Sequence, residues 1–263
     1  MSEIMIFLFC AAAICYLLSA SGSFSDLKKT RAAVWGFSVA GFLAQAFGLG
    51  FIAFKFGRMP VATSYELSEA IVCVSVFFFM ASSLFFRMKI GAFLFYLFAA
   101  AFSVLPVLCP KFFEGVSAGR AMGALSSVHV VLAVSSYALL AFSASLGGMY
   151  MLSRRLIKGK SNSLAARGNL SLEKVARLGK LALFSATALM FFSILAGGFA
   201  ALGAGSENLA ALKLAAGGVL FLMMLLLSFF SRFLADITSA RLCVLLFAVS
   251  ILLLIPIEMR TMQ

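Results

Sequence analysis

Apolar stretches of about twenty residues dominate this sequence, and each is long enough for one helix to cross a lipid bilayer. Eight of them follow one another, at residues 4–22, 32–53, 69–86, 90–108, 125–153, 181–203, 211–231 and 241–258. The bilayer core holds no water to satisfy exposed backbone groups, so each stretch is predicted to be an α-helix. The sequence thus predicts the all-α class, a polytopic transmembrane helix bundle of about eight spans, as one integral membrane domain over residues 1–263.

The composition excludes an ordinary soluble protein. Hydrophobic residues make up 63% of the 263 residues and charged residues 11%, whereas soluble domains are about half apolar and about a quarter charged. The longest polar stretch, Arg154 to Lys180, is too short for a separate catalytic domain. Glu3 is the only charge that precedes or enters the first apolar stretch, so this stretch is interpreted as a span and not as a cleavable signal peptide.

Lysine and arginine are distributed unevenly between alternate loops. Of the 21 basic residues, fifteen fall in the loops at 23–31, 87–89, 154–180 and 232–241, and the opposite loops and termini hold the other six together with six acidic residues. Basic residues collect in cytoplasmic loops. We therefore expect the first set of loops in the cytoplasm and both termini on the extracytoplasmic side. Topology then accounts for the net charge of +12, and no nucleic-acid partner is predicted.

The loop at 154–180 divides into two parts. Its first part carries basic residues that can meet anionic lipid head groups, namely Arg154, Arg155, Lys158 and Lys160. In the second part, Ser171 as an N-cap and Glu173 in the first turn predict a short interfacial helix leading into the sixth span. Two interpretations of the loop stay open, a solvated connector anchored by lysines and a surface that docks a partner.

The outer loop at 54–68 is the most distinctive polar segment. Gly57 and Pro60 end the second helix and predict a turn or an extended backbone. Ser64 is the expected N-cap of the third helix. Glu66 and Glu69 then lie near the positive end of the helix dipole, and this position explains both carboxylates without acid–base chemistry.

The chain offers few residues for chemistry. His129 is the only histidine, and the five cysteines contain no C-x-x-C pair. We therefore predict no zinc cluster, no catalytic residue and no intrinsic enzymatic activity. Cys109, beside a proline at an outer helix end, is the one thiol placed to react in an oxidising compartment. The Gly-Gly pairs at 147–148, 197–198 and 217–218 are expected to allow close helix approach.

His129 is the one ionisable group that we place inside a span away from the charged loops. Three roles stay open for its imidazole: ligation of a metal or haem iron, a hydrogen bond to a neighbouring helix, or an interfacial position. The spans otherwise hold almost no charged residues away from their ends, which counts against an ion-coupled transporter.

Three segments in order carry a resemblance to a known family. They are Met59 to Leu67, His129 to Phe142 with the following Tyr150 and Arg154-Arg155, and Leu170 to Leu178 ahead of Gly197-Gly198. Together they resemble the cytochrome c assembly protein family, which includes CcsA-type and HemX-type membrane proteins. The resemblance implies a multi-pass protein of the bacterial cytoplasmic (inner) membrane. It also implies that His129 is an axial haem ligand on the outer face, beside a loop containing Pro60, Tyr65 and Glu66.

The chain departs from the haem-handling members in two respects. Their tryptophan-rich segment corresponds here to residues 200–213, which contain no tryptophan and no Asp-Pro, and their second axial histidine has no counterpart. Cytochrome c synthase activity is therefore not expected from this chain alone. The resemblance implies an accessory or scaffold protein of haem handling, cytochrome c maturation or the tetrapyrrole pathway, with membrane lipids and other membrane proteins of such a pathway as partners. The alternative is a cofactor-free structural or regulatory subunit of a membrane complex.

Overall fold

The structure is a computed structural model that describes residues 3–23, 28–61, 63–85, 89–108, 124–158, 171–204, 207–231 and 233–260. These residues form eight α-helices: α1 (Glu3–Gly22), α2 (Lys28–Phe56), α3 (Ser64–Phe85), α4 (Lys89–Leu108), α6 (Ala124–Lys158), α8 (Leu172–Ala204), α9 (Glu207–Phe230) and α10 (Asp236–Arg260). The predicted all-α class is confirmed. Cys109, the thiol that the sequence places where it could react, lies outside the described residues.

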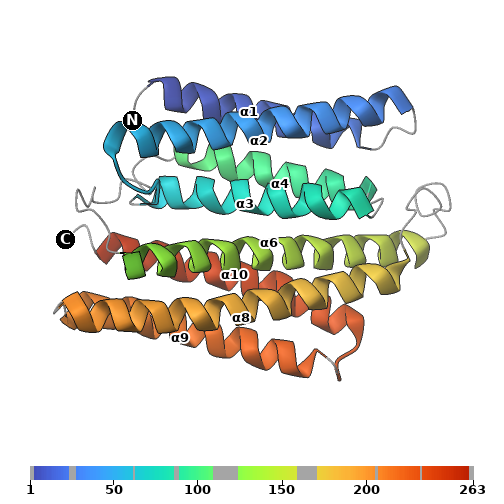
Figure 1. The fold of residues 1–263 in the computed structure, drawn as a ribbon. Helices are drawn as coiled ribbons and strands as arrows, with labels where there is room; N and C mark the ends of the chain where they lie inside the picture. The colour runs from blue at the N-terminus through green and yellow to red at the C-terminus, as the bar shows by residue number, and fades with distance from the viewer. Residues whose placement is uncertain are drawn as a thin grey trace.

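The helices run side by side with alternating direction, so that α1 begins and α10 ends at the same end of the bundle (Figure 1). Helices α1 to α4 form one half, and α6, α8, α9 and α10 form the other. Helix α6 is the member of the second half that faces the first. It packs along α8 and α10 of its own half, and it also contacts α3 and α4. Lys180 and Asp236, from two loops of the predicted cytoplasmic set, form an ion pair of 2.7 Å. The structure thus brings these loops to one end.

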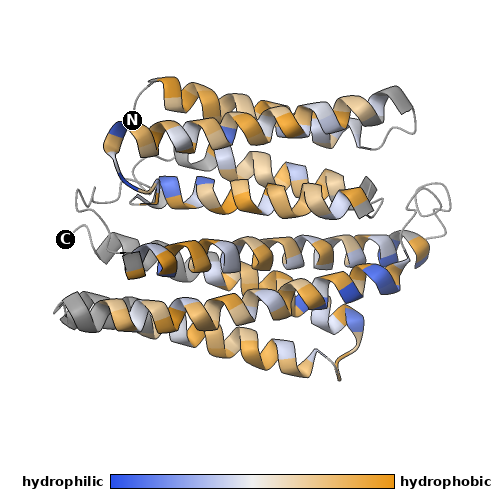
Figure 2. Cartoon of the chain, in the orientation of Figure 1, coloured by the Kyte–Doolittle hydropathy of each residue, from blue (hydrophilic) through white to orange (hydrophobic). Residues whose placement is uncertain are grey.

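Apolar residues cover the outside of the bundle along most of its length, and polar residues gather at its two ends (Figure 2). Among the described residues, α1, α2, α3, α6 and α8 are long and apolar enough to cross a membrane. Helices α4 and α9 contain shorter apolar stretches, at Ala92–Val104 and Ala215–Phe230. Large side chains such as Phe54, which is 89% exposed, face outward. An apolar exterior of this kind suits lipid and not water.

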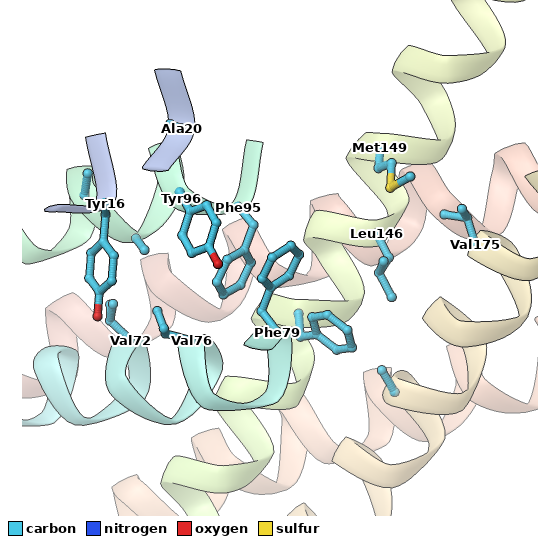
Figure 3. Packing of buried hydrophobic residues seen from close by; sticks show 14 of the residues in the cluster. Tyr16, Ala20, Val72, Val76, Phe79, Phe95, Tyr96, Leu146, Met149 and Val175 are labelled. Atoms are coloured by element: carbon cyan, nitrogen blue, oxygen red, sulfur yellow. The ribbon is translucent and has the colours of Figure 1, made fainter. Parts of the chain in front are cut away.

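Aromatic rings pack tightly where α3, α4 and α6 meet. The rings of Phe79 and Phe95 stack with centroids 4.3 Å apart, and Tyr96 and Phe142 approach Phe79 edge-on (Figure 3 shows Phe79, Phe95 and Tyr96). A second buried cluster joins α6 to α8, α9 and α10, and a third joins α1, α2, α3 and α6. Because α6 contributes to all three clusters, it holds the two halves together.

The structure corrects the interfacial helix predicted after Ser171. Leu172–Ala204 is one continuous helix, and its first turns pack on α6. Val175 is buried in the same cluster as Met149 and Tyr150 of α6. The Ser143 hydroxyl donates a hydrogen bond of 2.9 Å to the carbonyl oxygen of Gly179. No proline interrupts this segment. The residues before the expected start of the sixth span at 181 therefore belong to the same helix, and they pack on α6.

The start of α3 also differs from the prediction. The sequence predicts Ser64 as the N-cap and residue 65 as the first helical residue, but the helix begins at Ser64 and its N-cap is Thr63. The Thr63 hydroxyl accepts a hydrogen bond of 3.1 Å from the backbone N–H of Glu66, as an N-cap side chain does. Counted from Ser64, Glu69 lies more than one turn inside the helix. Glu69 is therefore not a residue of the first turn, and capping does not explain it.

Candidate functional site

His129 lies in the second turn of α6 and faces α8. Its Nδ1 is 2.6 Å from the carbonyl oxygen of Ser193. A carbonyl oxygen only accepts hydrogen bonds, so Nδ1 carries the proton in this contact. In the neutral imidazole, Nε2 then holds the free lone pair. None of the described residues forms a hydrogen bond with Nε2.

Two residues of α8, Ser193 and Gly197, contact the imidazole of His129 closely. Ser193 is buried, and its hydroxyl donates a hydrogen bond of 3.0 Å to the backbone carbonyl of His129. One turn later, a Cβ at Gly197 would lie 2.7 Å from Nδ1 of His129, whereas a Cβ at Gly198 would have no atom within 4 Å. Gly197 is therefore the member of the pair that close approach requires. The same holds for Gly147, where a Cβ would lie 2.8 Å from the carbonyl oxygen of Ala240 in α10.

The loop between α2 and α3, which the sequence predicts as an outer loop, is held by an ion pair. Gly57 adopts φ +60°, and Arg58 after it binds both carboxylate oxygens of Glu66 at 2.7 and 2.9 Å. The side chains of Arg58 and Glu66 are 12% and 7% exposed. The hydrogen bond from Arg58 to Glu66 raises the pKa of the guanidinium. Pro60, between them, is half-buried.

Tyr65 is buried below this loop. Its ring packs edge-on against Phe9 of α1, with centroids 5.3 Å apart, and it shares a cluster with Val134 of α6. His129 contacts α8, so Tyr65 and His129 pack on different neighbours. The structure thus places Tyr65 against α1 and α6, and the imidazole of His129 against α8.

The structure also reveals a buried polar group of four residues, one from each of the first four helices, which we call the polar core: Tyr16, Gln45, Glu69 and Ser103. All four are fully buried. The Tyr16 hydroxyl donates to Oε1 of Gln45 at 2.8 Å, and the amide nitrogen of Gln45 donates to Oε2 of Glu69. Ser103 donates to the same oxygen at 3.3 Å.

Sequence reasoning missed the polar core. The sequence predicts Glu69 near the N-terminus of the third helix, and it predicts no role for the three uncharged members. One signal was present, because Gln45 is the only glutamine within the apolar stretches. A polar residue in the middle of a membrane helix usually faces the bundle interior.

Among the described residues, no group of three or more His, Cys, Asp or Glu side chains is placed to hold a metal ion. His129 stays the candidate haem ligand that the sequence resemblance implies. Comparison with protein-family models, with curated proteins and with solved structures finds no match to this chain.

Proposed function

We propose that the chain is a membrane accessory or scaffold protein of a haem-handling or cytochrome c maturation pathway, in which Nε2 of His129 binds haem iron. The observation that carries this proposal is the hydrogen bond from Nδ1 to the Ser193 carbonyl. A ligating histidine typically donates its other ring N–H to a carbonyl or carboxylate, which fixes the tautomer and the ring orientation. The three family motifs found in the sequence support the same role.

The one histidine of this chain can supply one axial histidine ligand to haem iron. Haem iron, when bound, would supply redox or ligand-binding chemistry, and its second axial position needs a group that is not a histidine of this chain, which has only one. A partner protein or a second copy of the chain would provide it. This arrangement suits a protein that holds or passes haem and does not suit a complete synthase.

Absorption spectroscopy of the full-length protein, purified gently with its partners, tests the role of His129. We expect a Soret band that His129→Gln removes, because a glutamine amide can donate to the Ser193 carbonyl but does not replace imidazole as a ligand. The control is Ser193→Ala, which keeps the backbone carbonyl and is expected to keep the band. In the protein purified without its partners, His129 would be the one strong ligand, so any haem should bind carbon monoxide or imidazole readily and dissociate easily. Stoichiometric, tightly held haem in the protein purified alone would contradict one-ligand binding.

The same proposal includes eight spans, extracytoplasmic termini and a bacterial inner-membrane location. A reporter that is active only in the cytoplasm should therefore be silent when fused after Gln263. Inserted after Lys160, in the most basic loop, the same reporter should be active, because basic loops are retained in the cytoplasm. Activity at Gln263 with silence at Lys160 would reverse the proposed orientation.

One observation favours the alternative of a cofactor-free structural or regulatory subunit. Ser193 and Gly197 enclose the imidazole so closely that His129 can act as a helix–helix contact and nothing more. In that case His129→Gln leaves the spectrum unchanged and costs about 1 kcal/mol of stability for an altered interhelical hydrogen bond. A haem-free preparation that retains a specific membrane partner would support this alternative.

A further inference from the structure

Glu69 is a fully buried acid within an apolar helix. It is 0% exposed, and it lies in the stretch Tyr65–Leu84 of α3 that is long and apolar enough to cross a membrane. Placing a carboxylate at such a position is costly, so acids inside membrane bundles generally mark sites for ions or protons. Neither the ion pair at Glu66 nor the contact of His129 with α8 involves this residue.

The hydrogen bonds of Glu69 are incomplete in a specific way. Oε2 accepts hydrogen bonds from Gln45 and Ser103, whereas Oε1 is buried and has no partner among the described residues. The hydroxyl of Tyr65, one turn earlier on the same helix, is also buried, and no residue in the described part of the chain bonds it. Residues four apart lie on one helix face. Buried polar atoms without partners are rare in native structures, and two of them on one face indicate a small ligand that binds both.

The surroundings determine the charge of that ligand. The titratable groups around Glu69 are Tyr16 from α1 and Tyr65 and Cys73 from α3. The other helices packed around it contribute Gln45 from α2 and Ser103 from α4, which do not titrate. Among the described residues, no lysine, arginine or histidine pairs with Glu69. One carboxylate without a protein counter-charge requires one positive charge from elsewhere.

From this arrangement we infer that Glu69 and Tyr65 form an intramembrane site for a small monovalent cation, either a proton or Na⁺. Carboxylate and hydroxyl oxygens are the ligands that hard cations prefer. A single positive charge makes the site neutral, which is the condition for burial among apolar helices. Gln45 and Ser103 are positioning residues in this site, because they donate hydrogen bonds to Oε2 of the carboxylate, and Tyr16 in turn holds the Gln45 amide.

Labelling with the hydrophobic reagent dicyclohexylcarbodiimide tests the site in the full-length protein. The reagent modifies protonated carboxyl groups within membranes, and mass spectrometry of peptides identifies the modified residue. We expect an adduct on Glu69 in Na⁺-free choline buffer, and its formation should slow as the pH rises. If Na⁺ is the ligand, Na⁺ at about ten times its dissociation constant should slow labelling about tenfold, because about one site in eleven is then empty. If the proton alone binds, the pH dependence remains and Na⁺ has no effect beyond that of choline.

Three variants test the assignment of the site. Glu66→Gln removes the neighbouring acid, which is already paired with Arg58, and should leave the adduct in place, whereas Glu69→Gln should abolish it. Tyr65→Phe should weaken the protection by Na⁺ or move the midpoint of the pH profile. An unchanged profile in that variant would remove Tyr65 from the site.

The proposal fails if the wild-type protein forms no Glu69 adduct in Na⁺-free buffer at any pH from acidic to alkaline. It also fails if an adduct forms at a rate that neither Na⁺ nor pH changes. The labelling does not depend on His129 or on haem, so its outcome is separate from that of the proposed function.

Discussion

Replacing Phe79 by alanine is expected to lower the free energy of unfolding by about 3–5 kcal/mol. The side chain is 2% exposed, and its ring stacks on Phe95 and meets Tyr96 and Phe142 edge-on. Its removal would leave a cavity where α3, α4 and α6 join the two halves of the bundle. Between membrane helices, packing contacts and not the exclusion of water provide most of the attraction. The side chains that line a cavity lose these contacts, so the variant is less stable.

Unfolding in mixed micelles of a mild detergent and dodecyl sulfate, followed by circular dichroism, measures this difference. Phe77→Ala is the matched control, because Phe77 lies on the same helix and is 55% exposed. Its replacement is expected to change the stability by less than about 1 kcal/mol. Equal losses in the two variants would mean that the aromatic cluster does not join the two halves.

Replacing Gln45 by leucine is expected to cost about 2–4 kcal/mol, even though leucine is the more hydrophobic residue. The substitution removes the acceptor for the Tyr16 hydroxyl and a donor to Oε2 of Glu69. Hydrogen bonds between membrane helices average only about 0.6 kcal/mol in double-mutant cycles. A single replacement that leaves buried polar partners without bonds costs more, because each partner then bears its full desolvation penalty.

The same unfolding assay tests this prediction. Ser82→Ala is the control, because the Ser82 hydroxyl bonds only the Phe78 carbonyl of its own helix, and its change should lie within about 0.5 kcal/mol. The double variant Tyr16→Phe with Gln45→Leu should be more stable than the sum of the single losses predicts, since the two residues share one hydrogen bond. Additive losses, or a stabilised Gln45→Leu variant, would show that the polar core does not hold the first four helices together.

The residues that cap and interrupt helices explain why some predicted boundaries failed. Among the described residues, the eight helices and their alternating direction could be predicted, because apolar length is a local property of the chain. The start of α3 could not, because Thr63 and Ser64 are both competent N-caps, and the hydrogen bond to Glu66 distinguishes them. The start of α8 could not either, because Ser171 begins a helix whether that helix lies on the membrane surface or packs on α6.

The sequence by itself thus determined an all-helical bundle of apolar helices and the order of these helices. It also singled out His129, because the chain has one histidine. Only the tertiary structure decided which polar residues meet. His129 and Ser193 are 64 residues apart, and Gln45 and Ser103 are 58 apart. Their contacts depend on the rotation of each helix about its axis, and uniformly apolar helices leave that rotation unspecified in the sequence. Packing of small residues such as Gly147 and Gly197 sets it, because close approach of two helices is possible only along the faces that carry them.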